Sequence, residues 1–327
     1  MARLGLTVPF QSDTLARQAG ILDAVAPHGF TDLWSAEAAG SDAFTPLAAA
    51  AVSHPEFRLG TAIVPAYTRG PALLAMSAAA LAELAQSPIA LGIGSSSDVI
   101  VEKWNGLEFH APYQRVRDVA HFLRRAFTGE RVEMECASFS IKGFRLERVP
   151  ERVPKLLIAA LRPGMLRLAA RSADGAIVNW LSATDVHRVA GVVRDIAPDA
   201  EIVARLFVIP STDVAAVRAT AKRTIAAYLN VPVYAEFHRW LGRGSVLEPM
   251  WTSWHNGDRK GALEAIPDSL VDELFLYGTP AEIADRVREY AHAGVDTPIL
   301  AVLPAQGVSE LRPSDVAQIG AAYATLN

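Results

Sequence analysis

Short apolar stretches alternate with longer segments of helical periodicity along the chain. Each stretch is about five to eight residues long and nearly free of polar side chains, as expected of parallel strands that are covered on both faces. About eight strand–helix units can be counted, and this alternation predicts an α/β fold, a (β/α)₈ TIM barrel. The expected strands are residues 4–9, 32–36, 59–64, 89–94, 156–161, 176–180, 202–209 and 298–303.

Capping residues mark several helix ends. Segment 279–282 has the residues of a capping box with proline at the first helical position, and Gly294 is expected to end that helix. Segment 182–185 has a similar pattern with Asp185 in place of Glu. Apolar residues at helical spacing predict another helix over 115–127.

Two segments interrupt the regular repetition. Residues 131–148 alternate between apolar and polar around Lys142-Gly143, which predicts a β-hairpin inserted after the fourth unit. Residues 231–276 form a longer, helical insertion between strands 7 and 8. Insertions that follow a strand end lie at the functional face of a barrel, where they can serve as lids.

Composition narrows the class of protein. The 327 residues are 51% hydrophobic and 20% charged, which fits one compact domain over 1–327. The net charge of −4 is spread without runs of one sign, so neither nucleic acid nor a membrane is expected as a partner. Cys136 is the only cysteine, and the first ten residues do not resemble a secretory signal. We therefore expect a cytoplasmic protein without a disulfide or a thiolate-held metal.

Seven segments, taken in their order, carry a family resemblance. They are 29–37 (GFTDLWSAE), 60–65 (GTAIVP), 91–97 (LGIGSSS), 100–106 (IVEKWNG), 159–164 (AALRPG), 173–176 (ADGA) and 278–280 (GTP). Together they resemble the bacterial-luciferase-like monooxygenase superfamily, in particular its deazaflavin-dependent oxidoreductase branch. The resemblance covers nearly the whole chain.

That resemblance implies a homodimeric barrel that holds a planar ring across the C-terminal ends of its strands. The implied cofactor is coenzyme F420, a deazaflavin that transfers hydride and does not activate oxygen; reduced FMN is the alternative. Because the redox chemistry belongs to the cofactor, the protein would supply position and electrostatics. The implied substrate is a small organic molecule.

Glu37 is the candidate catalytic residue. It follows an apolar strand, at the catalytic face of a barrel, where a carboxyl group could relay the proton of the substrate. The alternative is structural: the carboxylate caps the next helix or pairs with an arginine. Relatives that oxidise glucose 6-phosphate have Asp-His where this chain has Glu37-Ala38, and a later Glu is replaced by Ser97, which argues against a sugar-phosphate substrate.

The candidate cofactor-binding residues follow other strands. The resemblance implies a non-proline cis peptide bond at Ala62-Ile63; an ordinary trans strand is the alternative. Glycine and hydroxyl groups after the fourth strand could approach a polar tail or phosphate, although a plain tight turn has the same composition. The start of the fifth helix favours an anion, but proline is also routine there. The full set is Ala62, Ile63, Gly94, Ser95, Ser96, Ser97, Ala160, Leu161, Arg162, Pro163, Gly164 and Asn179.

Some residues have a weaker case. Asn179 could contact the cofactor or cap a helix. Trp251, Trp254 and His255 could wall the substrate pocket, or pack a lid on the barrel. No metal-binding pattern of histidines and cysteines occurs, and neither does the nucleophile elbow of hydrolases.

The leading hypothesis is a coenzyme F420-dependent oxidoreductase acting on an alcohol or ketone, an enone or an imine. A two-component monooxygenase that uses reduced FMN is the rival within the same fold. A non-catalytic flavin-binding barrel is the rival of another class, because one fold hosts many functions.

Overall fold

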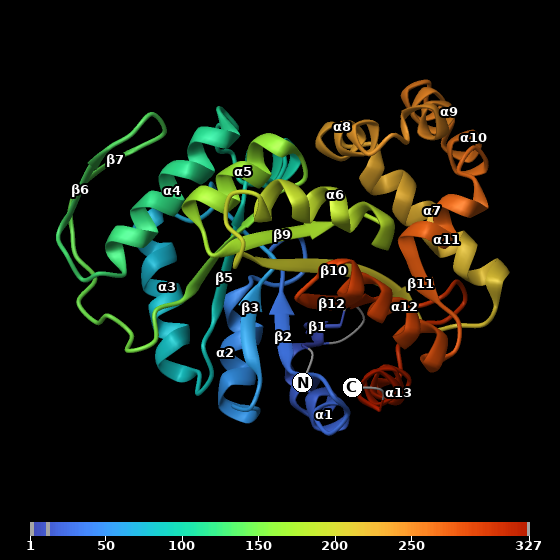
Figure 1. Ribbon diagram of the computed structural model, residues 1–327, viewed down its shortest axis with the longest axis horizontal. Helices are drawn as coiled ribbons and strands as arrows, with labels where there is room; N and C mark the ends of the chain where they lie inside the picture. The colour runs from blue at the N-terminus through green and yellow to red at the C-terminus, as the bar shows by residue number, and fades with distance from the viewer. Residues whose placement is uncertain (1–2, 11–13, 326–327) are drawn as a thin grey trace.

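Eight parallel strands form a closed barrel in the computed structural model, which describes residues 3–10 and 14–325 (Figure 1). The strands pair in the order β12–β1–β2–β3–β5–β8–β9–β10, and β10 pairs again with β12. The α/β barrel predicted from the alternating pattern is thus confirmed. The barrel strands are β1 Gly5–Thr7, β2 Asp32–Ser35, β3 Arg58–Thr61, β5 Ala90–Gly94, β8 Lys155–Ala159, β9 Gly175–Asn179, β10 Glu201–Ile209 and β12 Thr297–Val302.

The third expected strand is divided in two. It runs as β3 and then as β4, Val64–Pro65, which pairs with β5. Ala62 and Ile63 lie between the two pieces, and their peptide bond is cis, as the family resemblance implied.

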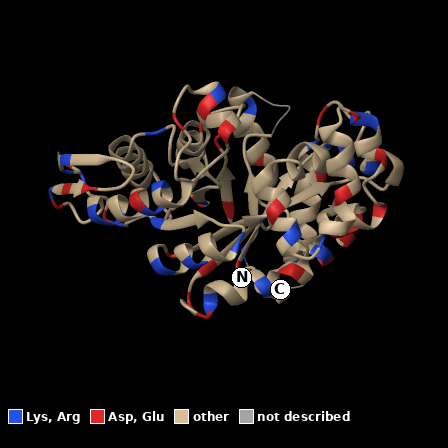
Figure 2. Cartoon of the chain, turned by 90° about the horizontal axis from the view of Figure 1, so that it is seen from above, with Lys and Arg blue, Asp and Glu red and all other residues tan. Residues whose placement is uncertain are grey.

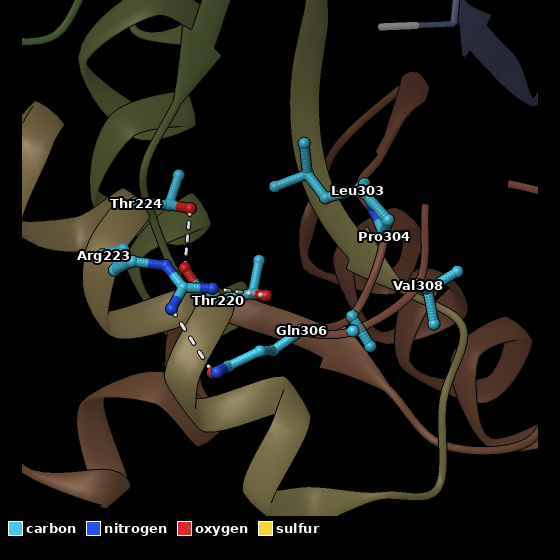
Figure 3. A pocket seen from close by; sticks show the side chains of 9 residues that line it. Thr220, Arg223, Thr224, Leu303, Pro304, Gln306 and Val308 are labelled. Atoms are coloured by element: carbon cyan, nitrogen blue, oxygen red, sulfur yellow. Dashed lines mark hydrogen bonds between the residues drawn. The ribbon is translucent and has the colours of Figure 1, made fainter. Parts of the chain in front are cut away.

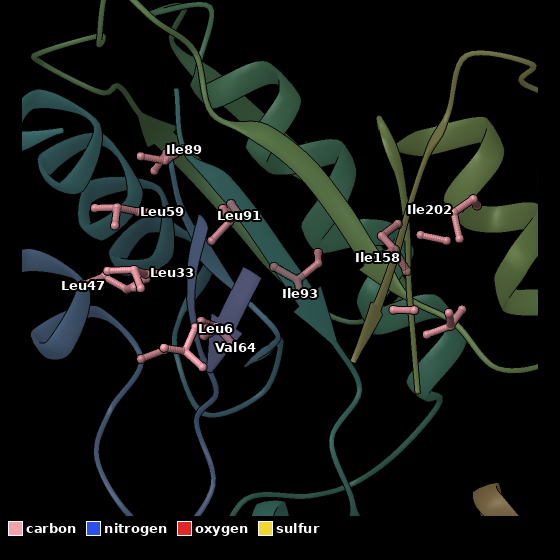
Figure 4. Close-up of a cluster of buried hydrophobic side chains, with 14 of the residues drawn as sticks. Leu6, Leu33, Leu47, Leu59, Val64, Ile89, Leu91, Ile93, Ile158 and Ile202 are labelled. Atoms are coloured by element: carbon pink, nitrogen blue, oxygen red, sulfur yellow. The ribbon is translucent and has the colours of Figure 1, made fainter. Parts of the chain in front are cut away.

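Helices cover the outside of the barrel. They are α1 Gln18–Val25, α2 Phe44–Ser53, α3 Pro71–Leu84, α4 Pro112–Ala126, α5 Pro163–Ser172, α6 Ala183–Arg194, α7 Val214–Leu229, α12 Pro280–Ala293 and α13 Pro313–Ala324, with a 3₁₀ turn, Leu15–Arg17, and a π-helix, Val99–Trp104. Outward side chains of the strands pack against these helices, and Figure 4 shows Leu33, Leu59, Leu91 and Ile202 among them. This apolar layer holds the strand ends in fixed positions.

Inward side chains fill the barrel in layers, as period-2 alternation along the strands requires. At the N-terminal end, Asp32, Arg58, Glu201 and Thr297 form a buried polar network. The next layer is apolar and contains Trp34, Ala90, Leu157, Ile177, Val203 and Ile299. Above it, toward the C-terminal ends, the interior opens.

Trp34 occupies much of the middle layer because two facing positions lack side chains. A Cβ atom at Gly60 would lie 2.4 Å from the Trp34 ring, and one at Gly5 would lie 2.8 Å from it. The indole is fully buried. Glycine is therefore required on β1 and β3 to admit this ring.

The helix ends follow the expected capping chemistry. Thr279 and Glu282 form a capping box at the start of α12, and Gly294 ends that helix with a φ of +119°. Ser182 and Asp185 form the same arrangement at α6.

The predicted hairpin is present, but its turn lies elsewhere. Strands β6, Val132–Glu135, and β7, Ser140–Phe144, are joined at Cys136, whose N–H donates to the carbonyl of Phe139. Gly143 lies inside β7, where the register shifts opposite Val132, and it has a φ of +76°. Glycine here marks a β-bulge, which the sequence alone cannot separate from a turn.

The insertion between the seventh and eighth barrel strands is helical, as expected. It contains α8 Pro232–Trp240, α9 Gly244–His255, α10 Arg259–Glu264 and α11 Asp268–Leu274, and ends in the short strand β11, Phe275–Tyr277, which pairs with β10. Helices α8, α9 and α10 lie together beside α7, and the hairpin β6–β7 projects at the other end of the molecule (Figure 1). The insertion packs on the barrel through a second apolar cluster that includes Trp180, Phe207 and Phe275.

Candidate active site

A cavity of about 760 Å³ opens at the C-terminal ends of the barrel strands. Its walls come from the ends of β2, β3, β5, β8, β9 and β10 and from the segment that leads into α8. The lining residues are Ala36, Glu37, Ala38, Ala62, Ile63, Gly94, Ser95, Ser96, Ser97, Ile100, Pro112, Tyr113, Ala159, Ala160, Leu161, Arg162, Pro163, Gly164, Met165, Ile177, Val178, Asn179, Arg205, Ala227, Tyr228, Val231, Val233 and Tyr234.

The structure brings Glu37 and every expected cofactor-binding residue to this one cavity. These residues are separated by up to 142 positions in sequence, from Glu37 to Asn179. Parallel strands in a closed barrel all end at the same rim, which explains the convergence. The individual roles of these residues remain predictions.

Glu37 makes the structural contacts that were its alternative interpretation. Arg69 Nε lies 3.1 Å and Nη2 2.9 Å from Glu37 Oε2, and the N–H of Ala43, just before α2, donates to the same oxygen at 3.2 Å. Asp42 accepts a further contact from Arg69 at 3.3 Å. The carboxyl group is fixed at the cavity wall by these donors, and it is not fully covered.

The serine turn after β5 is irregular. Ser96 has a φ of +63°, in the left-handed region that residues other than glycine seldom adopt. Ser97 lies just before the π-helix: its carbonyl accepts from Val101 N–H at 2.9 Å, and its hydroxyl accepts a long bond from Ile100 N–H at 3.4 Å. The turn thus presents three consecutive hydroxyl side chains beside the cavity.

The first turn of α5 faces the cavity as well. Pro163 is the first residue of the helix, and Arg162 at the N-cap makes no side-chain capping bond. Gly164 and Met165 line the cavity, and a Cβ atom at Gly164 would meet nothing within 4 Å. The N–H groups at the start of this helix therefore have free space in front of them and no capping side chain. Such N–H groups favour the binding of an anion.

The wall formed by β9 and β10 has polar groups that the sequence interpretation missed, apart from Asn179. Arg205 lies in β10, in register with Asn179 of β9, and Tyr234 lies at the start of α8. Asn179 Nδ2 donates to the Tyr234 hydroxyl at 3.4 Å. A signal existed for Arg205, because it is the single charged residue within the apolar stretch 202–209.

The three expected substrate-pocket residues do not lie at the cavity. Trp251 is buried in the second apolar cluster, and its Nε1 donates to the carbonyl of Leu229 at 2.9 Å. Trp254 packs at the edge of that cluster, and His255 is exposed with Nδ1 2.7 Å from the Trp251 carbonyl. Helix α9 packs on α10 and α8, and of the insertion only residues 231–234 line the cavity.

A smaller hollow of about 330 Å³ lies between α7 and the segment after β12 (Figure 3). Its polar groups bond to one another: Arg223 Nη1 donates to Gln306 Oε1 at 3.3 Å, and Thr224 donates to the Thr220 carbonyl at 2.8 Å. It is shallow and holds none of the residues expected to carry chemistry.

Other kinds of site find no support in the part of the chain that the structure describes. In residues 3–10 and 14–325, no group of three or more His, Cys, Asp or Glu side chains is arranged to hold a metal ion. No described helix is long and apolar enough to cross a membrane. Acidic and basic residues are interspersed in the view of Figure 2.

The fold and the cavity define a class: a TIM barrel whose strand C-termini surround one ligand-sized cavity. Comparison with known sequences gives the family. Residues 2–297 match the luciferase-like monooxygenase family, and the chain belongs to this family of oxidoreductases.

Individual relatives agree with this assignment. A Mycobacterium tuberculosis protein with the provisional name coenzyme F420-dependent oxidoreductase is 28% identical, over 86% of this chain and 90% of its own. The 5,10-methylenetetrahydromethanopterin reductase of Archaeoglobus fulgidus is 27% identical, over 73% of this chain and 74% of its own. The structure of the coenzyme F420-dependent tetrahydromethanopterin reductase from Methanopyrus kandleri superposes with a TM-score of 0.77 at 20% identity, covering 98% of this chain and 97% of that one.

Proposed function

We propose that this protein is a coenzyme F420-dependent oxidoreductase that moves hydride between the deazaflavin and a small alcohol or ketone, enone or imine. One observation carries the proposal: five of the seven segments that resemble the deazaflavin-dependent branch contribute residues to a single cavity at the strand ends. The names of the two sequence relatives support the choice of cofactor.

The volume of the cavity supports the binding of a ring-shaped cofactor. Its volume lies within the range of cofactor sites. A Cβ atom at Gly94 would lie 2.9 Å from Ala159 Cβ and 3.2 Å from the Ile63 side chain. Glycine therefore leaves no side chain of its own on this part of the cavity wall. Ile63 and Ala62 form the adjoining wall. A flat heterocycle fits against such a surface.

Different residues would bind different parts of the cofactor. The first turn of α5 and Arg162 would hold the phosphodiester of the cofactor, because unpaired N–H groups and a cation stabilise an anion there. The hydroxyl groups of the serine turn would bond to the polar tail. When bound, the deazaflavin gives or takes a hydride without activating oxygen.

Glu37 would hold the proton that the substrate gains or loses. Its carboxyl group lies at the rim, and the bonds from Arg69 and Ala43 fix its orientation. A fixed orientation favours proton transfer at a defined atom of the substrate. We extend the proposal to a homodimer, which light scattering of the purified protein would measure.

Cofactor titration tests the proposal. Coenzyme F420 and FMN are titrated separately into the purified protein, with quenching of cofactor fluorescence as the readout. The expected result is saturable binding of F420 at least about a hundredfold tighter than FMN, a difference of about 2.7 kcal/mol. Tighter binding of FMN, with oxygen consumption in the presence of an FMN reductase and NADH, would instead establish the monooxygenase rival. F420 binding without turnover of any alcohol, ketone, enone or imine would establish the non-catalytic rival.

A further inference from the structure

Arg205 is a cation inside the cavity with no anionic partner among the described residues. It lies two positions after Val203, a member of the apolar interior layer, so its side chain also points into the barrel. Its Nε atom is buried without a hydrogen-bond partner. Within residues 3–10 and 14–325 the guanidinium makes no hydrogen bond or ion pair, and its Cζ atom lies 5.2 Å from the centre of the Phe207 ring.

A second arginine inside the same barrel shows the contrast. Arg58, at the N-terminal end, lies 2.6 Å from Glu201 and 3.3 Å from Asp32 and is neutralised by them. Glu37 is the carboxylate on the wall of the cavity, and Arg69 already pairs with it. An inward-facing charge without a partner is costly. Arg205 is therefore poorly explained as a structural residue.

The neighbours of Arg205 are hydrogen-bond donors. Burial raises the pKa of Tyr234, so its phenol remains protonated at neutral pH. The phenol oxygen accepts from Asn179, which leaves the phenol proton free for another acceptor. Arg205 and Tyr234 thus present a guanidinium and a hydroxyl group at one wall of the cavity.

We propose that Arg205 and Tyr234 form a subsite for a carboxylate group of the substrate. One guanidinium balances one negative charge, and its paired N–H groups match the two oxygens of a carboxylate. The inference rests on the proposed function and narrows its substrate class to carbonyl, hydroxyl, enone or imine compounds that also carry a carboxylate.

The position of the subsite also orients the substrate. Glu37 follows β2, and Arg205 lies on β10, three places away in the eight-stranded barrel, so the two side chains belong to different walls of the cavity. A substrate whose carboxylate is bound by Arg205 extends across the cavity toward Glu37. Its reacting carbon then lies between the two walls, over the place proposed for the ring.

Binding of two matched pairs of small molecules tests the subsite. Benzoate and phenylacetate are compared with their neutral amides, by calorimetry, on the purified wild-type protein and on Arg205→Met. Arg223→Met is the control, because Arg223 lies on α7 in the smaller hollow, outside the cavity (Figure 3). F420 affinity and the unfolding temperature are measured for all three proteins.

The expected result has four parts. The wild type and Arg223→Met bind at least one carboxylate about tenfold or more tightly than its amide, which is the scale of a charged hydrogen bond. Arg205→Met loses this preference. Its F420 affinity stays within about twofold of wild type. Its unfolding temperature is unchanged or higher, since a buried donor without a partner has been removed.

Three outcomes overturn the subsite: no carboxylate preference in the wild type, a preference that persists in Arg205→Met, or loss of F420 affinity in that variant, which would assign Arg205 to the cofactor. Failure of the wild type to bind F420 would refute the proposed function instead. The carboxylate comparison does not use F420, so the two failures are distinguishable.

Discussion

Arg58 and Glu201 form a two-bond ion pair through the interior of the barrel. Arg58 Nη1 lies 2.6 Å from Glu201 Oε1, and Nη2 lies 2.9 Å from Oε2. The pair joins β3 to β10, which are on opposite sides of the closed sheet. Arg58 holds the pKa of Glu201 at about 2 even though burial opposes ionisation. The network closes the N-terminal end of the barrel, away from the cavity.

We expect Arg58→Met to destabilise the protein by about 3–5 kcal/mol, because Glu201 and Asp32 remain buried and keep only the half-exposed cations of Lys155 and Arg3. Urea unfolding at pH 7 measures the change. The double variant Arg58→Met/Glu201→Leu should recover a large part of the loss. If the single variant is as stable as wild type, the network has no structural importance.

Glu37→Gln should lower kcat by about 10²- to 10⁴-fold if the carboxyl group carries the proton of the substrate. The amide keeps the shape of the side chain, so F420 affinity should be unaffected. Glu83→Gln is the control, since Glu83 also pairs with an arginine, Arg148, but lies on α3 outside the cavity. Wild-type turnover by Glu37→Gln would leave Glu37 with only the structural role of binding Arg69 and Ala43.

Gly164→Asp should weaken F420 binding about tenfold or more, because a negative charge at the first turn of α5 opposes the phosphodiester. Gly164→Ala is the matched control: its Cβ atom would meet nothing within 4 Å, so affinity should be retained. Fluorescence titration at low and high salt measures both variants. The effect of the aspartate should shrink at high salt, where charges are screened. Equal F420 affinity of the two variants at low salt would show that the phosphodiester does not bind at the first turn of α5.

His238 should make stability depend on pH. Burial lowers its pKa to about 3 in the folded protein, from 6.5 for an unperturbed histidine. The unfolded chain therefore binds the proton first, so this contribution is complete above pH 6.5 and is lost as pH falls toward 3. The slope is about 1.4 kcal/mol per pH unit, or about 2 kcal/mol between pH 6.5 and 5.

Urea unfolding of wild type and His238→Gln at pH 7, 6 and 5 measures that slope. The variant should lose less stability over this range than wild type. Glu201 does not interfere, because its stabilising contribution is lost only below about pH 4.5. Parallel pH dependence in the two proteins would show that His238 does not titrate as described.

Local patterns predicted much of the fold. Runs of apolar residues located the eight barrel strands, and the chemistry of Thr279, Glu282 and Gly294 located both ends of α12. The hairpin was found too, but Gly143 was interpreted as its turn, since a glycine in a bulge and a glycine in a turn look alike in sequence. In the insertion, the helices could be predicted, but the neighbours against which the apolar side of each helix packs could not. Trp251 is consequently buried away from the cavity.

By itself, the sequence determined where the eight barrel strands lie to within about two residues, apart from the division of the third, and so which residues lie near the rim of the barrel. Period-2 alternation is a local property, and all parallel strands end on the same side. Only the tertiary structure decided which residues are partners. Arg58 and Glu201 are 143 positions apart, and Arg69 reaches Glu37 across 32. Such pairs, and the missing partner of Arg205, exist only once the barrel closes, because closure brings together side chains whose separation in sequence carries no record of contact.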